Sequence, residues 1–431
     1  MTTHAPGAAP KPPPIGVRRP FSLLAKPTGA ACNLDCSYCF FLSKEVLWDA
    51  SSQEMSEQVR HAWISQFLDS QPDGEVILAW QGGEPTLRGL EFFREAVCLA
   101  EELRRPRQQV RHTIQTNATL IDDQWARFLA EHNFLVGVSI DGPPELHDRY
   151  RVNKAGRGTY EQVVRGWRAL QRHGVEANIL CTVNAVNGDH PLQVYRHFRD
   201  DLGADFMQFI PIVERFEAGS EAVAEASWRD PQGRFVLYRQ TGTKVSSRSV
   251  LPGQYGDFLI AVFDEWVGRD VGSVYVQDFD VALGALFGQY GLCVHAPECG
   301  DAVAIEHTGD LYSCDHFVEP GYRLGNVATD DLQHLVQGPF QREFGTAKRT
   351  SLTRQCQECP VRWACHGGCP KDRFATTSDG EPGLSYLCEG YFRFYTHIAP
   401  ALHHMGRLLR VGRAPAEIMT IPAPGAAPPR R

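Results

Sequence analysis

The sequence predicts an α/β fold in which a partial barrel of six parallel strands precedes a small cysteine-rich domain. Between residues 21 and about 215, apolar runs rich in β-branched residues alternate with segments of helical periodicity. This alternation is typical of parallel strands joined by crossover helices. Between residues 293 and 388 the pattern changes to short apolar runs, many glycines and eight cysteines. Six parallel strands favour an open or partial barrel over a closed eight-stranded one.

The repeating unit of the barrel is one strand followed by one helix. The strands are expected at 21–26, 75–80, 111–116, 134–140, 177–183 and 205–210. The helices between them are expected at 56–68, 90–103, 122–132, 160–173 and 190–202. Gly174 and Gly203 follow the last two helices, at the position where a glycine commonly ends a helix. Two more helices are expected at 255–267 and 281–287.

Shifts in composition divide the chain into five parts. Residues 1–20 are rich in Pro, Ala and Gly and are expected to be a disordered tail. The partial barrel is assigned to 21–255, linker helices to 256–292 and the cysteine-rich domain to 293–400. Residues 401–431 are expected to form a C-terminal helix and, from residue 413, a second flexible tail.

Charge and hydropathy limit the classes of partner. The net charge is 43 minus 51, or −8, which gives no electrostatic basis for binding nucleic acid or an anionic membrane. Residues 1–20 lack the apolar stretch of a secretory signal, and the longest apolar runs are far too short to span a bilayer. A cytoplasmic location is therefore expected. In a reducing cytosol, 13 cysteines, most of them clustered, indicate metal binding rather than disulfides.

Three cysteines, Cys32, Cys36 and Cys39, form a C-x3-C-x2-C pattern just after the first strand. Loops that follow parallel strands lie at the functional end of such a sheet. Three thiolates leave a cubane iron–sulfur cluster with one open iron, which can bind a substrate. The alternative is a structural zinc site completed by a distant histidine, because structural zinc requires four ligands.

The second group of cysteines is large enough for two complete four-cysteine sites, as iron–sulfur clusters use. It consists of Cys293, Cys299, Cys314, Cys356, Cys359, Cys365, Cys369 and Cys388. Two structural zinc sites are the alternative, but zinc ribbons usually pair two C-x2-C knuckles per site, and only Cys356 and Cys359 have that spacing. Cys98 and Cys181 stand apart and are expected to be buried apolar residues.

The first cysteine motif resembles that of the radical S-adenosylmethionine (SAM) superfamily. The resemblance implies a TIM-like (β/α)6 partial barrel whose [4Fe–4S] cluster binds SAM through the open iron and cleaves it to a 5′-deoxyadenosyl radical. It places Tyr38 near the adenine, and the run Gln81-Gly82-Gly83-Glu84, which ends the second strand, near the methionine amino group. Other residues that match SAM-binding positions of the family are Asn117, Ser139, Arg151 and Ile212.

Two of these residues have ordinary alternatives. The guanidinium fork of Arg151 suits a carboxylate, but Arg151 could instead form a surface ion pair. Ile212 could contact adenine or be a plain core residue.

The second cysteine group resembles the SPASM extension of peptide-modifying radical enzymes, above all the anaerobic sulfatase-maturating enzymes. The resemblance covers roughly residues 20–400. It implies that one auxiliary [4Fe–4S] cluster is held by Cys293, Cys299, Cys314 and Cys369. It implies that the other is held by Cys356, Cys359, Cys365 and Cys388. Full cysteine ligation leaves no open iron, so both clusters should carry electrons.

Asp315 follows Cys314 directly, at the position of the proposed general base of the maturases. Loss of a hydrogen atom from the substrate Cβ, of a proton from its thiol or hydroxyl and of an electron to a cluster completes a two-electron oxidation. The alternative for Asp315 is a carboxylate that accepts backbone N–H bonds in a turn. Asp280 is a second candidate, for positioning the substrate or capping a helix. Ser313 and His316 depart from the proline and the aromatic residue that relatives often have.

The resemblance implies that a Cys or Ser in an unfolded sulfatase segment is oxidised to formylglycine (3-oxoalanine), with reduced ferredoxin or flavodoxin as electron donor. One alternative is an enzyme of the same class that oxidises or cross-links a ribosomally made peptide, although no separate precursor-binding domain is evident. Another is a non-catalytic, metal-stabilised binding module, against which the open-iron motif argues.

Four histidines lie near the cysteine clusters in the sequence: His295, His307, His316 and His366. Because the cysteine count already completes both auxiliary sites, these histidines are expected to donate hydrogen bonds to sulfur or to lie at the surface.

Overall fold

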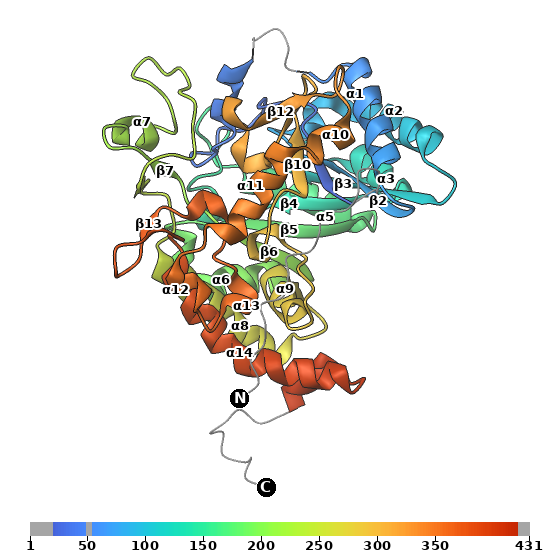
Figure 1. The fold of residues 1–431 in the computed structure, drawn as a ribbon. Coiled ribbons are helices and arrows are strands. Elements are labelled where there is room, and N and C mark those ends of the chain that lie inside the picture. The colour runs from blue at the N-terminus through green and yellow to red at the C-terminus, as the bar shows by residue number, and fades with distance from the viewer. Residues whose placement is uncertain (1–19, 49–53, 421–431) are drawn as a thin grey trace.

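The computed structural model describes residues 20–48 and 54–420. Within them, a ten-stranded sheet in the order β12-β11-β10-β1-β2-β3-β4-β5-β6-β9 forms the centre of the molecule (Figure 1). The expected tails lie outside the described residues, except for Pro20 and residues 413–420. Pro415–Thr420 form a short 3-10 helix that packs against α14 (Cys388–Arg410), so the prediction of a flexible tail is wrong for that stretch.

The six predicted barrel strands and the five predicted helices are all present. Strands β1 to β6 are adjacent and parallel. They span Ser22–Ala25, Gly74–Trp80, Gln108–Thr116, Leu135–Ser139, Glu176–Val183 and Phe206–Pro211. The helices α1, α2, α3, α5 and α6 span Glu57–Ser70, Gly89–Leu103, Asp123–Glu131, Tyr160–Arg172 and Pro191–Arg196. Gly174 and Gly203 have φ angles of 66° and 65°, which confirms their place at helix ends.

The alternation of side chains along β2 separates a core face of the sheet from an accessible face. Val76, Leu78 and Trp80 are buried, whereas Ile77 between them is 43% exposed. Trp80 packs edge-on against Trp63 of α1, with ring centroids 5.1 Å apart. The helices therefore cover the face of β2 that carries Trp80, and the opposite face of this strand is more accessible.

Two helices differ from their predicted bounds. The helix predicted at 190–202 is interrupted, because His197–Asp201 after α6 form a π-helical turn. The helix predicted at 281–287 is α9 (Gln277–Ala285), which begins four residues earlier. Asp278 and Asp280 lie in its first turn, where negative charge stabilises the helix N-terminus. Val276 is the N-cap residue, so Asp280 does not cap the helix.

Three strands of the cysteine-rich segment extend the barrel sheet. β10 (Ala302–Ile305) pairs in parallel with β1, with Ala25 opposite Ile305. β11 (Asp310–Tyr312) and β12 (Arg323–Asn326) follow in antiparallel orientation. At the other edge, β9 (Tyr275–Val276) pairs with β6. The first strand of the chain is thus an interior strand of the sheet.

Helices α8 (Pro252–Arg269) and α14 pack along one another in the lower part of Figure 1. They approach closely at two glycines, since a Cβ added to Gly256 would lie 2.7 Å from the Cα of Gly390. The remaining short elements are α4 (Pro144–His147), α7 (Glu221–Glu225), α10 (Leu332–Val336), α11 (Pro339–Thr350), α12 (Arg354–Gln357), α13 (Arg362–Cys365), β7 (Arg215–Phe216), β8 (Lys244–Val245), β13 (Ala375–Thr376) and β14 (Pro382–Leu384).

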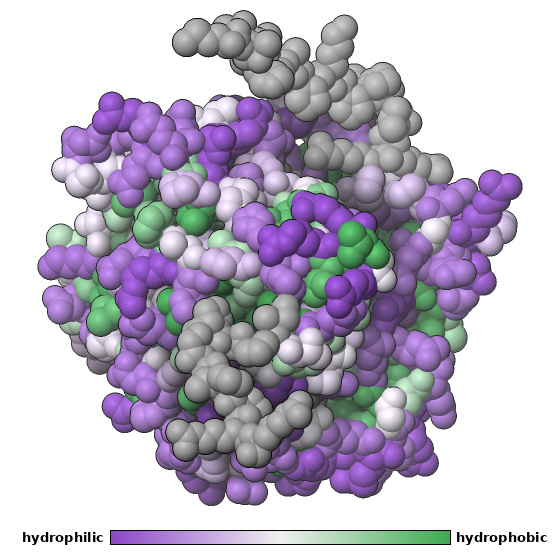
Figure 2. Space-filling view, turned by 90° about the horizontal axis from the view of Figure 1, so that it is seen from below, coloured by the Kyte–Doolittle hydropathy of each residue, from purple (hydrophilic) through white to green (hydrophobic). Residues whose placement is uncertain are grey.

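The surface seen in Figure 2 is mostly hydrophilic, with hydrophobic residues in small separate groups. In the part of the chain that the structure describes, no helix is both long enough and apolar enough to cross a bilayer. Large apolar side chains are instead concentrated in the core between the sheet and its helices.

We expect Gly256→Ala to destabilise the protein, because its methyl group would meet the backbone of Gly390. Overpacking of this kind costs about 1–3 kcal/mol. Gly268→Ala on the same helix is the matched control, since nothing lies within 4 Å of its Cβ position. It should be neutral or stabilising by about 0.5–1 kcal/mol. Thermal unfolding measures both variants, and equal midpoints would contradict the close approach of α8 and α14.

Candidate functional site

The three cysteines of the first motif lie in the loop that follows β1, at the carboxyl end of the parallel strands. Cys32, Cys36 and Cys39 are half-buried. Burial raises the pKa of each thiol, that of Cys36 to about 12, although Arg151 acts on Cys36 in the opposite direction. Grouped and desolvated thiols of this kind fit an iron–sulfur cluster, because bound iron stabilises the thiolate that burial disfavours.

The glycine pair after β2 packs directly against the cysteine loop. A Cβ on Gly83 would lie 2.0 Å from the carbonyl oxygen of Ala31. The N–H groups of Gly83 and Glu84 donate to the carbonyls of Gly29 and Ala31, at 2.8 and 2.9 Å. Glycine is therefore required at position 83 for contact between two backbones, whether or not a ligand is bound.

Glu84 ties this loop to the ends of β2 and β3. Its Oε1 accepts hydrogen bonds from the hydroxyls of Thr86 and Thr116, at 2.6 and 2.7 Å, and its Oε2 accepts the N–H of Asn117 at 2.7 Å. Both oxygens are thus occupied within the protein, so Glu84 supports the site. Asn117 places its amide nitrogen 3.8 Å from the Sγ of Cys32.

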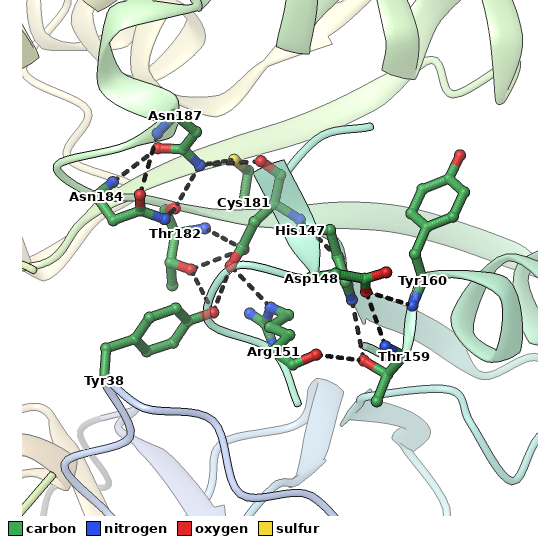
Figure 3. A network of polar contacts seen from close by, with 11 residues as sticks. Tyr38, His147, Asp148, Arg151, Thr159, Tyr160, Cys181, Thr182, Asn184 and Asn187 are labelled. Atoms are coloured by element: carbon green, nitrogen blue, oxygen red, sulfur yellow. Dashed lines mark hydrogen bonds and ion pairs between the residues drawn. The ribbon is translucent and has the colours of Figure 1, made fainter. Parts of the chain in front are cut away.

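Tyr38, Arg151 and Thr182 converge in a buried polar network at the ends of β4 and β5 (Figure 3). Its centre is Asp141, whose Oδ2 accepts hydrogen bonds from the Tyr38 hydroxyl and, at 2.9 Å, from Arg151 Nε. Its Oδ1 accepts from the N–H and Oγ1 of Thr182, at 3.0 and 2.7 Å. Burial alone would raise the pKa of Asp141, but Arg151 and His147 hold it below its usual value.

Arg151 is buried, with 9% of its side chain exposed, so it does not form the surface ion pair considered as an alternative. Its guanidinium lies over the ring of Tyr38, 5.5 Å from the ring centroid. Nε binds Asp141, whereas Nη1 and Nη2 form no hydrogen bond with any residue in the described ranges. The N–H groups of these two nitrogens remain available to an anionic ligand.

The other residues matched to SAM positions lie at the same edge of the sheet. Ser139 is buried at the end of β4. The Oε1 of Gln81 is buried and has no hydrogen-bond partner among the residues described. The backbone of Ile212 binds Val183 and Val250, at 2.8 and 3.1 Å, which leaves its half-buried side chain for an apolar contact.

Asp315 begins a 3-10 turn and forms an ion pair with Lys26, which follows β1 directly. Lys26 is 1% exposed, whereas 23% of the Asp315 side chain is accessible. Burial would raise the pKa of Asp315, but Lys26, His316 and Lys44 together outweigh this effect and lower it. Phe40, next to Cys39, stacks on His316 with ring centroids 5.8 Å apart. An ionised carboxylate therefore lies beside the three-cysteine loop.

A second buried ammonium lies near this pair. Lys44 donates to the carbonyl of Tyr238 at 2.6 Å and lies 3.8 Å from Glu319. Burial lowers the pKa of Lys44 to about 8, against the opposing effect of Glu319. Gln240 donates its N–H to Glu319 at 3.0 Å, so the segment between β6 and α8 also contacts this cluster of charges.

The eight cysteines of the second group form two separate sets. One set, Cys356, Cys359, Cys365 and Cys388, lines a single pocket. In the other, Cys314 lies near Cys369 and Cys293, whose charges add to burial in raising its pKa. The Lys348 ammonium lies among Cys299, Cys369 and Cys293, which oppose the lowering of its pKa by burial. Closed groups of thiols with a buried cation fit anionic iron–sulfur clusters.

Several expectations about isolated residues need correction. Cys98 is exposed, because it lies on the outer face of α2, although Cys181 is buried as predicted. Asp280 does not cap α9, and its role in positioning a substrate stays a prediction; it is exposed and forms no hydrogen bond or ion pair with the described residues. His295 and His307 are buried rather than at the surface, while His316 lies 3.9 Å from the Sγ of Cys314.

Sequence reasoning missed two central residues, Asp141 and Lys26. Lys26 directly follows β1, and Asp141 lies two residues after the end of β4. Residues at the carboxyl ends of barrel strands point toward the site. A search for charged residues at the carboxyl ends of the predicted strands would have found both.

Two family models match the chain: the radical SAM superfamily over residues 27–197 and the iron–sulfur cluster-binding SPASM domain over residues 296–360. The chain is 41% identical to the serine-type anaerobic sulfatase-maturating enzyme of Bacteroides thetaiotaomicron, over 97% of this chain and 96% of that protein. It is 32% identical to the cysteine-type enzyme of Clostridium perfringens, over 89% and 97%.

A solved structure of native anSMEcpe with bound AdoMet and Cp18Cys peptide has a TM-score of 0.76 to this chain at 29% identity. The match covers 91% of this chain and 100% of that one. Similarity of sequence and structure thus extends over the barrel and the cysteine-rich segment alike, and the chain belongs to the anaerobic sulfatase-maturating enzymes of the radical SAM superfamily.

Proposed function

We propose that the protein oxidises a serine or cysteine side chain of a sulfatase polypeptide to formylglycine. The observation that carries the proposal is the position of Asp315. Its ionised carboxylate forms an ion pair with Lys26 and lies beside the three-cysteine loop. Oxidation of an alcohol or thiol to the aldehyde level requires a proton acceptor at the substrate, and Asp315 is partly accessible there. The two relatives described above are named as serine-type and cysteine-type enzymes, so both side chains are included.

The residues of this chain divide the work at the first site. When bound, the cluster and SAM supply a 5′-deoxyadenosyl radical that removes a hydrogen atom from the substrate Cβ. Asp315 takes the proton of the substrate hydroxyl or thiol, and Lys26 keeps Asp315 ionised beforehand. Arg151 offers its free N–H groups to the SAM carboxylate, and Asp141 fixes both Arg151 and Tyr38.

The cysteines are assigned in three groups. Cys32, Cys36 and Cys39 would hold the first [4Fe–4S] cluster. The auxiliary clusters would be held by Cys293, Cys299, Cys314 and Cys369, and by Cys356, Cys359, Cys365 and Cys388. The buried ammonium of Lys348 supports the first of these auxiliary sets, because it offsets the negative charge of the thiolates. The proposal extends to a cytoplasmic enzyme that receives electrons from reduced ferredoxin or flavodoxin.

Anaerobic reconstitution with iron and sulfide should load about 12 iron atoms per chain, or three cubane clusters. Incubation with reductant, SAM and a sulfatase-derived peptide should then give 5′-deoxyadenosine and a peptide aldehyde, both measured by mass spectrometry. The triple variant Cys32→Ala, Cys36→Ala, Cys39→Ala should keep about eight irons and form neither product. Deoxyadenosine with an unchanged peptide would reject the sulfatase substrate, and zinc in place of iron would reject the whole proposal.

Asp315→Asn should uncouple the two products. The amide keeps the shape of the side chain but cannot accept the proton, so aldehyde formation should fall by about 10²–10⁴-fold while SAM cleavage continues. Both products are measured in the same reaction. Asp379→Asn, which removes an exposed carboxylate paired with Arg354, is the control and should behave as the parent enzyme. Parallel loss of both products would mean that Asp315 supports the cluster instead.

Iron content tests the assignment of the second cysteine group to two sets. Cys388→Ala should lose about four of roughly twelve irons. Adding Cys356→Ala, from the same set, should lose no more, whereas adding Cys293→Ala should lose about four more. If the Cys356/Cys388 double variant lost about eight irons, the two cysteines would belong to different clusters.

A further inference from the structure

Near the Asp315–Lys26 pair lies a buried carboxylate that the proposed mechanism does not use. Glu306 follows β10 directly and has 0% exposure. Neither of its carboxylate oxygens has a hydrogen-bond partner in the described part of the chain. Burial of a carboxylate without partners is unfavourable unless nearby charge or a proton compensates it. The surroundings of Glu306 must therefore supply one or the other.

The strand register places Glu306 beside Lys26. Ala25 of β1 lies opposite Ile305 of β10, and the N–H of Lys26 continues the ladder by donating to the carbonyl of Ile305 at 2.9 Å. Lys26 and Glu306 are therefore the next neighbours across the two strands, and such neighbours point to the same face of a sheet. Lys26 thus contacts Asp315 and has Glu306 as its strand neighbour.

Two ammonium groups lie near Glu306, but each pairs with another carboxylate. Lys26 pairs with Asp315, and Lys44 lies 3.8 Å from Glu319. Glu306 acts on Lys44 as well, and on the hydroxyl of Tyr312 in β11. Among the described residues neither ammonium forms an ion pair with Glu306. A proton on Glu306 would remove the cost of burying its charge.

His307 continues from Glu306 toward the outside. Its Nδ1 lies 3.7 Å from Oε2 of Glu306, and neither ring nitrogen has a hydrogen-bond partner among the described residues. The expectation that this histidine donates to sulfur or lies at the surface is therefore wrong. Its ring meets the half-exposed Trp48 edge-on, with centroids 5.1 Å apart. Glu306 and His307 thus connect the buried charges with the side of the molecule where Trp48 is accessible.

We propose that Glu306 receives the proton released by the substrate, by way of Asp315 and Lys26, and that His307 passes it on to solvent. This inference rests on the proposed function. Protonated Asp315 gives its proton to Lys26 while Lys26 gives one to Glu306, so Lys26 remains an ammonium throughout. Glu306 then loses the proton through His307 before the next turnover. One proton enters and one leaves, and no electrons move in these steps.

The physical advantage of this path is that the substrate proton does not remain beside the substrate. A neutral Asp315 cannot accept the proton of the next substrate, whereas transfer to Glu306 restores its charge. The unpartnered oxygens of Glu306 are suited to an ordered water between Lys26 and Glu306, since buried waters usually bind otherwise unsatisfied polar groups.

Glu306→Gln and His307→Phe test the two halves of the path in the iron-loaded enzyme. With Glu306→Gln, Asp315 still accepts the proton of the first substrate, so the first turnover should be normal. Aldehyde formation in later turnovers should fall by about a hundredfold, the lower end of what a positioned proton acceptor contributes. Deoxyadenosine formation and iron content should not change. With His307→Phe, the first turnover should be normal and later turnovers slow. In Glu306→Ala, added formate should restore aldehyde formation, because it can occupy the space of the missing carboxylate.

Glu214→Gln is the matched control, because Glu214 is also a buried carboxylate but pairs with Arg248, outside this cluster. It should keep the parent ratio of aldehyde to deoxyadenosine. A parent-like ratio in the later turnovers of Glu306→Gln would overturn the inference, and so would equal loss of aldehyde, deoxyadenosine and iron, which would make Glu306 structural. Failure of the proposed function is distinct, since the parent enzyme itself would then form no aldehyde from the peptide.

Discussion

The parallel pairing of β1 with β10 is the constraint on which the candidate site depends. β1 leads into the loop of the first three cysteines, and β10 is the first strand of a hairpin whose second strand, β11, leads to Cys314 and Asp315. Because the two strands are in register, they deliver the residues that follow them to one edge of the sheet. The Lys26–Asp315 ion pair and the stacking of Phe40 on His316 both follow from this pairing. The three-cysteine loop and Asp315, which are far apart in the sequence, thereby share one site.

Buried ionic groups are concentrated at this edge of the sheet, and stability does not explain them. A buried ion pair gains little over well-packed apolar residues, because both charges lose their hydration. The Arg151–Asp141 and Lys26–Asp315 pairs nevertheless have three side chains that are at most 9% exposed. Each pair leaves polar atoms available to a ligand. In one pair these are the Nη groups of Arg151, and in the other they are the accessible part of the Asp315 carboxylate. The cost of burial is therefore accompanied by groups that are ready to bind a ligand or accept a proton.

The sequence was sufficient for the barrel strands and helices, because each has a strong local signal. Periodicity of apolar residues marks β1 to β6, and the glycines at 174 and 203 mark two helix ends. The beginning of α9 was missed because Asp278 and Asp280 interrupt the apolar pattern while they stabilise its first turn. The place of β10 beside β1 could not be predicted from its four residues alone, since pairing between distant strands is decided by tertiary packing.

The site residues likewise divide into those with a local sequence signal and those that only the fold brings together. Cysteine spacing identified the groups of thiols, because ligand identity is local in sequence. The partners of Arg151 and Asp315 were not identified, because Asp141 and Lys26 reach them only through the arrangement of strands. Glu306 carries no sequence signal at all. It resembles any other charged residue in a short polar stretch until the register of β1 and β10 places it beside Lys26.

Three cysteines of one auxiliary set, Cys356, Cys365 and Cys388, lie on helices of very different length. Cys388 is the first residue of α14, and Gly390 two residues later packs on Gly256 of α8, so helix packing alone fixes the position of this thiol. Cys356 and Cys365 lie instead in α12 and α13, which are four residues each. Helices this short are not stable by themselves. The position of Cys388 therefore depends on the packing of α14 against α8, whereas the positions of Cys356 and Cys365 depend on the tertiary contacts of two short helices.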